Sequence, residues 1–266
     1  MKKTCILLFV FIILWVNLAA QVVKTDNGII LKTVNGNVHT LQIEVLTDNI
    51  IHLAASPTDV FSNRNNEVVS KISGKALFSV AIRNETITIK TTTLNVIVDQ
   101  KNGKVIFMNK QNKQLLEENN RVYKPFKNFA ESSWTVQQEF KWSMDEVLYG
   151  LDKNINRSQS LRGCKFELFS EKADNNFPLI VSSKGYGVLW DNKSYTCFTD
   201  VDTASYIWSE DADQIDYYFL YGPSHDEVVV NYIKLTGKIE LMPKLAQGVI
   251  SPEESNSLKL GTGILK

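Results

Sequence analysis

Short runs of β-branched and other apolar residues, separated by turn residues, recur through the first half of the chain. The runs cover residues 29–34, 38–46, 50–55, 77–82, 86–90, 94–99 and 105–108, and none has the period of a helix. Asn35-Gly36 and Asn102-Gly103 lie between runs, and Asn-Gly is typical of tight hairpins because both central residues need positive φ. This spacing predicts an antiparallel β-sandwich rather than a parallel sheet with crossover helices.

The second half continues the pattern after a less regular segment. Residues 119–133 contain Pro125 and several aromatic residues, and we expect a long connection there. Further strands are expected at 134–142, 147–151, 163–169, 196–199, 205–208 and 215–221, with polar loops at 152–158 and 170–176. Between Phe177 and Asn192, two apolar runs flank Ser-Ser-Lys-Gly-Tyr-Gly, which predicts a hairpin in the middle of a sheet with both faces covered.

One helix is expected, near the end of the sandwich. Ser224 and Glu227 form a capping box, Asp226 adds negative charge to the first turn, and Gly237 ends the helix. The helix carries one apolar stripe, made of Val228, Val229, Tyr232, Ile233 and Leu235.

Composition and the first residues bear on location and partners. The 266 residues include 29 basic and 29 acidic side chains, so the charge gives no indication of a nucleic acid or an anionic membrane as partner. Met1-Lys2-Lys3, the apolar run 5–16 and Ala19-Ala20 predict a secretory signal peptide over 1–20, because that run is too short to span a membrane. We therefore expect export to the periplasm or the cell exterior, with no membrane span once the signal is removed. In the mature chain, Cys164 and Cys197 are expected as free buried thiols, with a disulfide as the alternative.

Four motifs carry a family resemblance. They are Leu148-Tyr149-Gly150-Leu151, the hairpin ending in Leu189-Trp190-Asp191-Asn192, the run 216–222 and Leu235-Thr236-Gly237. In this order and at this spacing they resemble the N-terminal region of glycoside hydrolase family 31, the α-glucosidases and α-xylosidases. The resemblance covers about residues 25 to 247. The Leu-Trp-Asp-Asn motif is most similar to the bacterial α-xylosidase branch.

The resemblance implies an all-β, galactose mutarotase-like sandwich over 21–222, then a linker helix and the start of a catalytic barrel over 223–247. The family would continue after Met242-Pro243-Lys244 with tryptophan, but position 245 is leucine, and 248–266 is expected to be a disordered tail. We therefore expect a chain that ends before the barrel. Because the resemblance places both catalytic aspartates of these retaining enzymes on the barrel, no catalytic residue is assigned here. A separately supplied barrel domain is the implied protein partner.

The resemblance also implies a loop of the sandwich that lines the entrance of the substrate pocket. The matching loop contains Glu171 and Asp174, which are the candidate substrate-binding residues for an oligosaccharide. Sugar sites combine aromatic faces with polar side chains. Four tryptophans are available as platforms, although core positions are favoured for each: Trp134, Trp142, Trp190 and Trp208.

Other chemistry has less support. His39, His52 and His225 are scattered without ligand spacing, so no metal and no cofactor is expected. The acidic clusters are interpreted as solvated turn residues: Asp145, Glu146, Asp200, Asp202, Asp211 and Asp213.

Two alternatives to a glycosidase portion stay open. One is a free-standing extracytoplasmic carbohydrate-binding module. The other is an aldose epimerase, which needs a histidine and a glutamate facing each other, whereas the histidines here are expected to lie far from any glutamate-bearing motif. If a barrel is missing, we also expect an exposed apolar patch near the last strands and the helix.

Overall fold

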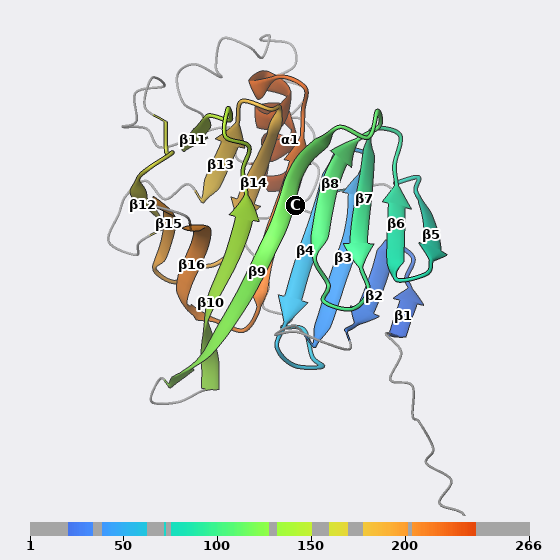
Figure 1. Ribbon diagram of the computed structural model, residues 1–266, viewed down its shortest axis with the longest axis horizontal. Helices are drawn as coiled ribbons and strands as arrows, with labels where there is room; N and C mark the ends of the chain where they lie inside the picture. The colour runs from blue at the N-terminus through green and yellow to red at the C-terminus, as the bar shows by residue number, and fades with distance from the viewer. Residues whose placement is uncertain are drawn as a thin grey trace, which may run out of the picture.

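The computed structural model describes residues 21–33, 39–62, 72, 76–127, 132–150, 160–169, 178–201 and 204–237. In this part of the chain the strands form two antiparallel sheets, and one helix follows them (Figure 1). This confirms the expected all-β sandwich with a C-terminal helix. Cys164 and Cys197 are both free, as favoured from the sequence, but only Cys197 is buried, whereas Cys164 is partly exposed.

One sheet has eight strands in the order β1-β2-β3-β4-β17-β14-β13-β11. Their bounds are β1 Gln21–Lys24, β2 Gly28–Lys32, β3 Thr40–Thr47, β4 Ile50–Ser56, β11 Leu148–Gly150, β13 Leu179–Ser182, β14 Tyr186–Trp190 and β17 Ile215–Tyr221. The predicted hairpin is β13 and β14, which lie inside the sheet and are buried along their whole length. Gly185 turns the chain between them with φ of 81°.

The other sheet has nine strands in the order β12-β15-β16-β10-β9-β8-β7-β6-β5. Their bounds are β5 Ser79–Arg83, β6 Thr86–Lys90, β7 Leu94–Asp99, β8 Val105–Asn109, β9 Gln114–Lys127, β10 Ser132–Lys141, β12 Lys165–Phe169, β15 Thr196–Val201 and β16 Ala204–Ala212. The two sheets stack face to face, and their facing apolar side chains form the larger hydrophobic core.

The connection expected at 119–133 is wrong, because β9 runs to Lys127 and β10 begins at Ser132. Pro125 is accommodated for a clear reason. The partner β8 reaches β9 only as far as the pair Ile106–Glu117, so beyond that point the described strands leave β9 paired with β10 alone. A strand with one open side tolerates a residue that lacks an N–H.

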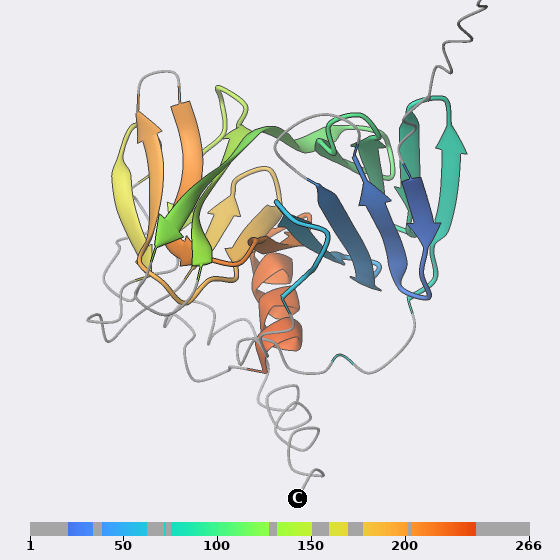
Figure 2. The ribbon, with the colours of Figure 1, turned by 90° about the horizontal axis from the view of Figure 1, so that it is seen from below.

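The helix α1, His225–Thr236, has the predicted capping box at Ser224 and Glu227, and Gly237 ends it in the left-handed conformation. Figure 2 shows α1 on the face of the eight-stranded sheet that is turned away from the other sheet. Gly187 lets it approach closely, since a Cβ there would lie 2.8 Å from a Val228 methyl carbon.

The expected exposed apolar patch near the helix is not found in the described residues, because the apolar stripe of α1 packs on the sheet. The large apolar side chains that the described part does expose lie on neither α1 nor β17: Val23, Val60, Leu77, Ile82, Met144 and Val201.

Candidate functional site

The predicted substrate-binding residues Glu171 and Asp174 lie outside the described residues. The two ends of their loop are described. The chain enters the loop from β12, the edge strand of the nine-stranded sheet, and leaves it into β13 of the eight-stranded sheet. Residues 170–177 therefore lead from the end of β12 in one sheet to the start of β13 in the other, and the polar clusters of the described residues are considered next as candidate sites.

Glu146 lies beside Ser182, at the end of β13 away from this loop, and is not a solvated turn residue, so that interpretation is wrong. Its carboxylate is 2% exposed and accepts hydrogen bonds from the hydroxyls of Ser182 and Tyr186 and, at 2.8 Å, from the backbone N–H of Ser143. Burial, followed by the charge of Glu146, raises the pKa of Tyr186 well above its usual value. The carboxylate thus fixes the turn before β11 against the β13–β14 hairpin.

Asp200 also departs from the expected turn, since it lies within β15. Its carboxylate accepts hydrogen bonds at 2.8 Å from Arg162 Nε and from the backbone N–H of Gly163. Burial opposes ionisation, but the hydrogen bonds from Gly163, Ser205 and Arg162 lower the pKa of Asp200. The same guanidinium donates to the Ser143 carbonyl at 2.8 Å, so Arg162 ties β15 to the turn that precedes β11.

Of the other predicted turn carboxylates, Asp145 is exposed and pairs with Lys184, and Asp213 lies in the bend between β16 and β17. Asp211 lies at the end of β16 rather than in a turn. Asp202 is outside the described residues.

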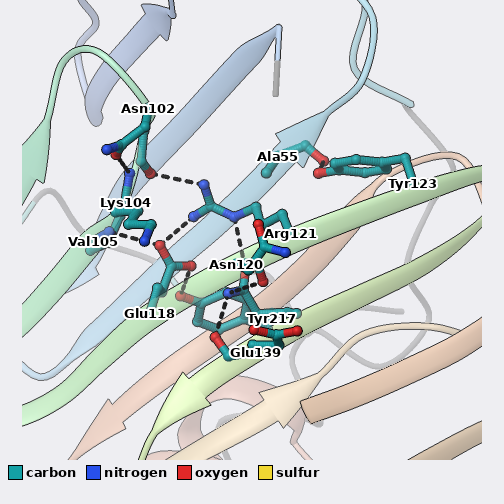
Figure 3. A network of polar contacts seen from close by, with 12 residues as sticks. Ala55, Asn102, Lys104, Val105, Glu118, Asn120, Arg121, Tyr123, Glu139 and Tyr217 are labelled. Atoms are coloured by element: carbon teal, nitrogen blue, oxygen red, sulfur yellow. Dashed lines mark hydrogen bonds and ion pairs between the residues drawn. The ribbon is translucent and has the colours of Figure 1, made fainter. Parts of the chain in front are cut away.

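A buried ion pair lies between the sheets (Figure 3). Glu118 pairs with Arg121 and accepts hydrogen bonds from Tyr217 Oη at 2.7 Å and from the Val105 N–H at 2.8 Å. Arg121 also donates to Gln138 Oε1 at 2.7 Å and to a backbone carbonyl at 2.8 Å. This network links β9 and β10 to β17 through hydrogen bonds. Its side chains are buried, so a substrate in solvent does not reach them.

A second ionic cluster corrects the expectation that the histidines lie far from glutamate. His52 on β4 bonds through Nδ1 to Glu44 at 2.8 Å and through Nε2 to Asp216 at 2.7 Å, and its ring stacks on Tyr218 at 4.5 Å. Burial alone would lower the pKa of His52, but the charges and hydrogen bonds of Asp216 and Glu44 outweigh it and raise the pKa to about 10. The hydrogen bond from His52 lowers the pKa of Glu44. Both ring nitrogens are occupied, so this imidazolium is a poor proton carrier.

Two of the four candidate tryptophans are core residues, as favoured from the sequence. Trp142 and Trp190 are buried, and Trp190 Nε1 donates to Ser209 Oγ at 2.8 Å. Trp134 is partly buried and packs against the core. Trp208 is partly exposed and contacts Tyr195, with ring centroids 6.1 Å apart.

The described residues include no group of three or more His, Cys, Asp or Glu side chains arranged to hold a metal ion. Within the same residues, no helix has the length and apolarity needed to cross a membrane.

Two stacked antiparallel sheets, with a capped helix on the outer face of one, define the class of protein: a galactose mutarotase-like β-sandwich. Residues 40–198 match the model of the glycosyl hydrolase 31 N-terminal galactose mutarotase-like domain. The chain belongs to this family.

Curated proteins with similar sequences include α-xylosidases. An α-xylosidase of Saccharolobus solfataricus is 30% identical over 229 residues, which are 82% of this chain and 31% of the relative. An α-xylosidase of Lactiplantibacillus pentosus is 30% identical over 125 residues, or 43% of this chain and 16% of the relative. The chain thus spans about a third or less of these two relatives.

Solved structures share the fold. The family 31 α-xylosidase of Xanthomonas citri superposes with a TM-score of 0.70 over 83% of this chain and 40% of that chain, at 17% identity. The family 31 dextranase of Flavobacterium johnsoniae superposes with a TM-score of 0.67 over 83% of this chain and 28% of the dextranase chain, at 22% identity.

Proposed function

We propose that this chain acts as the N-terminal, carbohydrate-binding sandwich of an exported α-glycosidase that hydrolyses α-xylosides or α-glucosides. The family match over residues 40–198 carries the proposal. The names of the relatives, among them two α-xylosidases and an α-glucosidase of Bacillus thermoamyloliquefaciens, favour this substrate class.

On this proposal the chain has no hydrolytic activity alone and works with a catalytic barrel. A retaining glycosidase needs two carboxyl groups about 5 to 5.5 Å apart, facing an open site. The carboxylates that we would first consider in the described part are engaged otherwise: Glu118 is buried in an ion pair, and Glu44 and Asp216 are joined by His52. The assay is hydrolysis of 4-nitrophenyl α-xyloside and α-glucoside by the purified chain.

The sandwich contributes to sugar binding through the loop that contains Glu171 and Asp174. The support is that both strands flanking the loop are held within the sheets, since β12 pairs with β15 and β13 is buried between β11 and β14. Fixed flanking strands lower the entropy lost when the loop residues bind a ligand. The test is an NMR titration of the chain with methyl α-xyloside, in which amides of 170–177 should shift and the E171A/D174A double variant should weaken binding. The matched control is D145A, which removes an exposed carboxylate outside the loop.

Export is the remaining part of the proposal, supported by the basic and apolar pattern of residues 1–20. Expression of the whole chain in a bacterial host, followed by fractionation and N-terminal sequencing, should give an extracytoplasmic protein that starts near Gln21. Recovery of uncleaved chain from the cytoplasm would contradict it.

A free-standing carbohydrate-binding module is the alternative, and the partly exposed Trp208 and Tyr195 favour it. It differs from the first proposal in one measurable way. A module binds polymeric or long oligosaccharides without a barrel, and its affinity does not change when a barrel is supplied. Calorimetry with gluco- and xylo-oligosaccharides that shows no heat would remove it.

A further inference from the structure

Trp208 lies on the outer face of the nine-stranded sheet, beside its β12 edge. The strand register pairs Trp208 with Cys197 on one side and with Gln137 on the other, and pairs Cys197 in turn with Glu167. Residues paired across antiparallel strands point to the same face. One row of this face therefore runs from a carboxylate, past a small thiol and an indole, to an amide.

The aromatic pair on this face is held in place. Tyr195 meets Trp208 at an interplanar angle of 75°, and its hydroxyl donates to Glu167 Oε1 at 2.8 Å. Hydrogen bonds to the Cys197 thiol and to the Glu167 carboxylate raise the pKa of Tyr195, so the phenol stays protonated as a donor. A tyrosine ring tethered at its far end loses little further freedom when a ligand binds.

Polar groups on the same face are also pre-arranged. Gln137 Nε2 donates to Glu139 Oε1 at 3.2 Å, and Asn119 Nδ2 donates to Glu139 Oε2 at 3.1 Å. These amides and carboxylates keep lone pairs that can accept hydrogen bonds from hydroxyl groups.

The two rings are not part of the hydrophobic cores. Neither Trp208 nor Tyr195 packs against either core cluster, in contrast to Trp134. The helix α1 contacts β13, β14 and β17, which all belong to the other sheet. A core role therefore does not account for a tryptophan and a tyrosine at this place.

The cluster lies at the root of the loop 170–177. The last residue of β12, Phe169, pairs with Thr196, which directly follows Tyr195. Glu167 lies on the same strand, two residues before Phe169, so Tyr195 and Glu167 both lie near the end of β12, from which the loop begins.

We propose that Trp208, Tyr195 and Glu167 form a binding site for one ring of a neutral oligosaccharide, next to the substrate loop. A pyranose ring offers an apolar face to the partly exposed indole and hydroxyls to the carboxylate and amides. The carboxylates of Glu167 and Glu139 disfavour an anionic ligand such as a phosphate. The inference rests on the proposed function for the role of the loop, but the site itself belongs to the sandwich.

The test is an NMR titration of the purified, uniformly ¹⁵N-labelled chain, which reports both the tryptophan indoles and the backbone amides, with isomaltotriose and with a xylose-branched xyloglucan oligosaccharide. The Trp208 indole resonance should shift, and the other indoles should stay in place. W208A should weaken binding about tenfold or more, while W208F, which keeps an aromatic face, should retain most of it. E167A should weaken binding about fivefold through the lost tether and acceptor. Y149A, which removes a partly exposed tyrosine from the other sheet, is the matched control.

The outcomes distinguish the Trp208 binding site from the function proposed for the whole chain. Absence of any shift at Trp208 in the wild type overturns the site, and this readout stands even if W208A fails to fold. Shifts confined to amides of 170–177 overturn the site but support the substrate loop. Unchanged affinity in folded W208A also overturns it. Hydrolysis of aryl glycosides by the chain alone contradicts the proposed function and leaves this binding test unaffected.

Discussion

The Glu44–His52–Asp216 cluster makes stability depend on pH in a defined direction. His52 has a pKa of about 10 in the folded protein and about 6.5 in the unfolded chain. Since folding raises this pKa, the stabilisation is fully present below pH 6.5 and is lost as pH rises toward 10. Linkage gives at most about 4–5 kcal/mol at pH 6 and about 1–2 kcal/mol at pH 9, a loss of about 3 kcal/mol. Glu44 contributes in the opposite direction. Folding lowers its pKa, so its contribution to stability is present at neutral pH and is lost as the pH falls below the usual pKa of a glutamate.

The perturbation is H52Q, measured by urea unfolding of wild type and variant from pH 6 to pH 9 under reducing conditions. Glutamine keeps polar atoms near both carboxylates but removes the titrating cation. We expect H52Q to be less stable by several kcal/mol at pH 6, and the difference to shrink by about 3 kcal/mol at pH 9. H39Q, at an exposed histidine, should follow the wild type at every pH.

The reasoning is refuted if wild type and H52Q lose stability in parallel between pH 6 and pH 9. NMR titration gives a second test, since the His52 ring should stay protonated up to about pH 9. A ring that titrates near 6.5 would show that the two carboxylates do not hold it as an imidazolium.

Three further predictions concern the fold. R121M should cost about 3–5 kcal/mol in unfolding free energy, because it leaves the Glu118 carboxylate buried without its partner, and E118Q/R121M should recover part of that loss. G28A should prevent a stable fold, since its Cβ would lie 1.9 Å from a backbone oxygen on β3, whereas G163A, with open space but a φ of 73°, should cost only about 1 kcal/mol by thermal unfolding. S224A should lower the free energy of unfolding by about 1 kcal/mol, because it removes the capping box of α1. Circular dichroism melts measure this loss, and a variant as stable as the wild type would contradict the prediction.

Much of the architecture follows from local patterns in the sequence. The hairpin and the helix each have signals within a few residues: two apolar runs around Gly185, and a capping box followed by an apolar stripe and Gly237. Local chemistry decides these elements, so they can be predicted without knowledge of the fold. The strand β9 could not, since the tolerance for Pro125 depends on where the neighbouring β8 ends.

The polar clusters depend on contacts between distant parts of the chain. His52 and Asp216 are separated by 164 positions and meet only because β4 pairs with β17. The sequence does contain an indication of this contact. His52 and Asp216 are both polar residues within apolar strand runs, and a buried polar residue usually has a hydrogen-bond partner. Glu118 carries no such signal, because it lies in none of the predicted strands and directly before the connection expected at 119–133. Tyr195 gave none either, because only the pairing of β15 with β16 brings it beside Trp208.

The central claim is that this sandwich serves an α-glycosidase without carrying out hydrolysis itself. Release of 4-nitrophenol from the aryl α-xyloside and α-glucoside, by the purified chain at high concentration and against a buffer blank, tests it most directly. The account predicts no release above the blank with either substrate. Turnover that disappears when a carboxylate such as Glu44 or Glu167 is changed to its amide would contradict the account, because a catalytic pair would then lie within the sandwich.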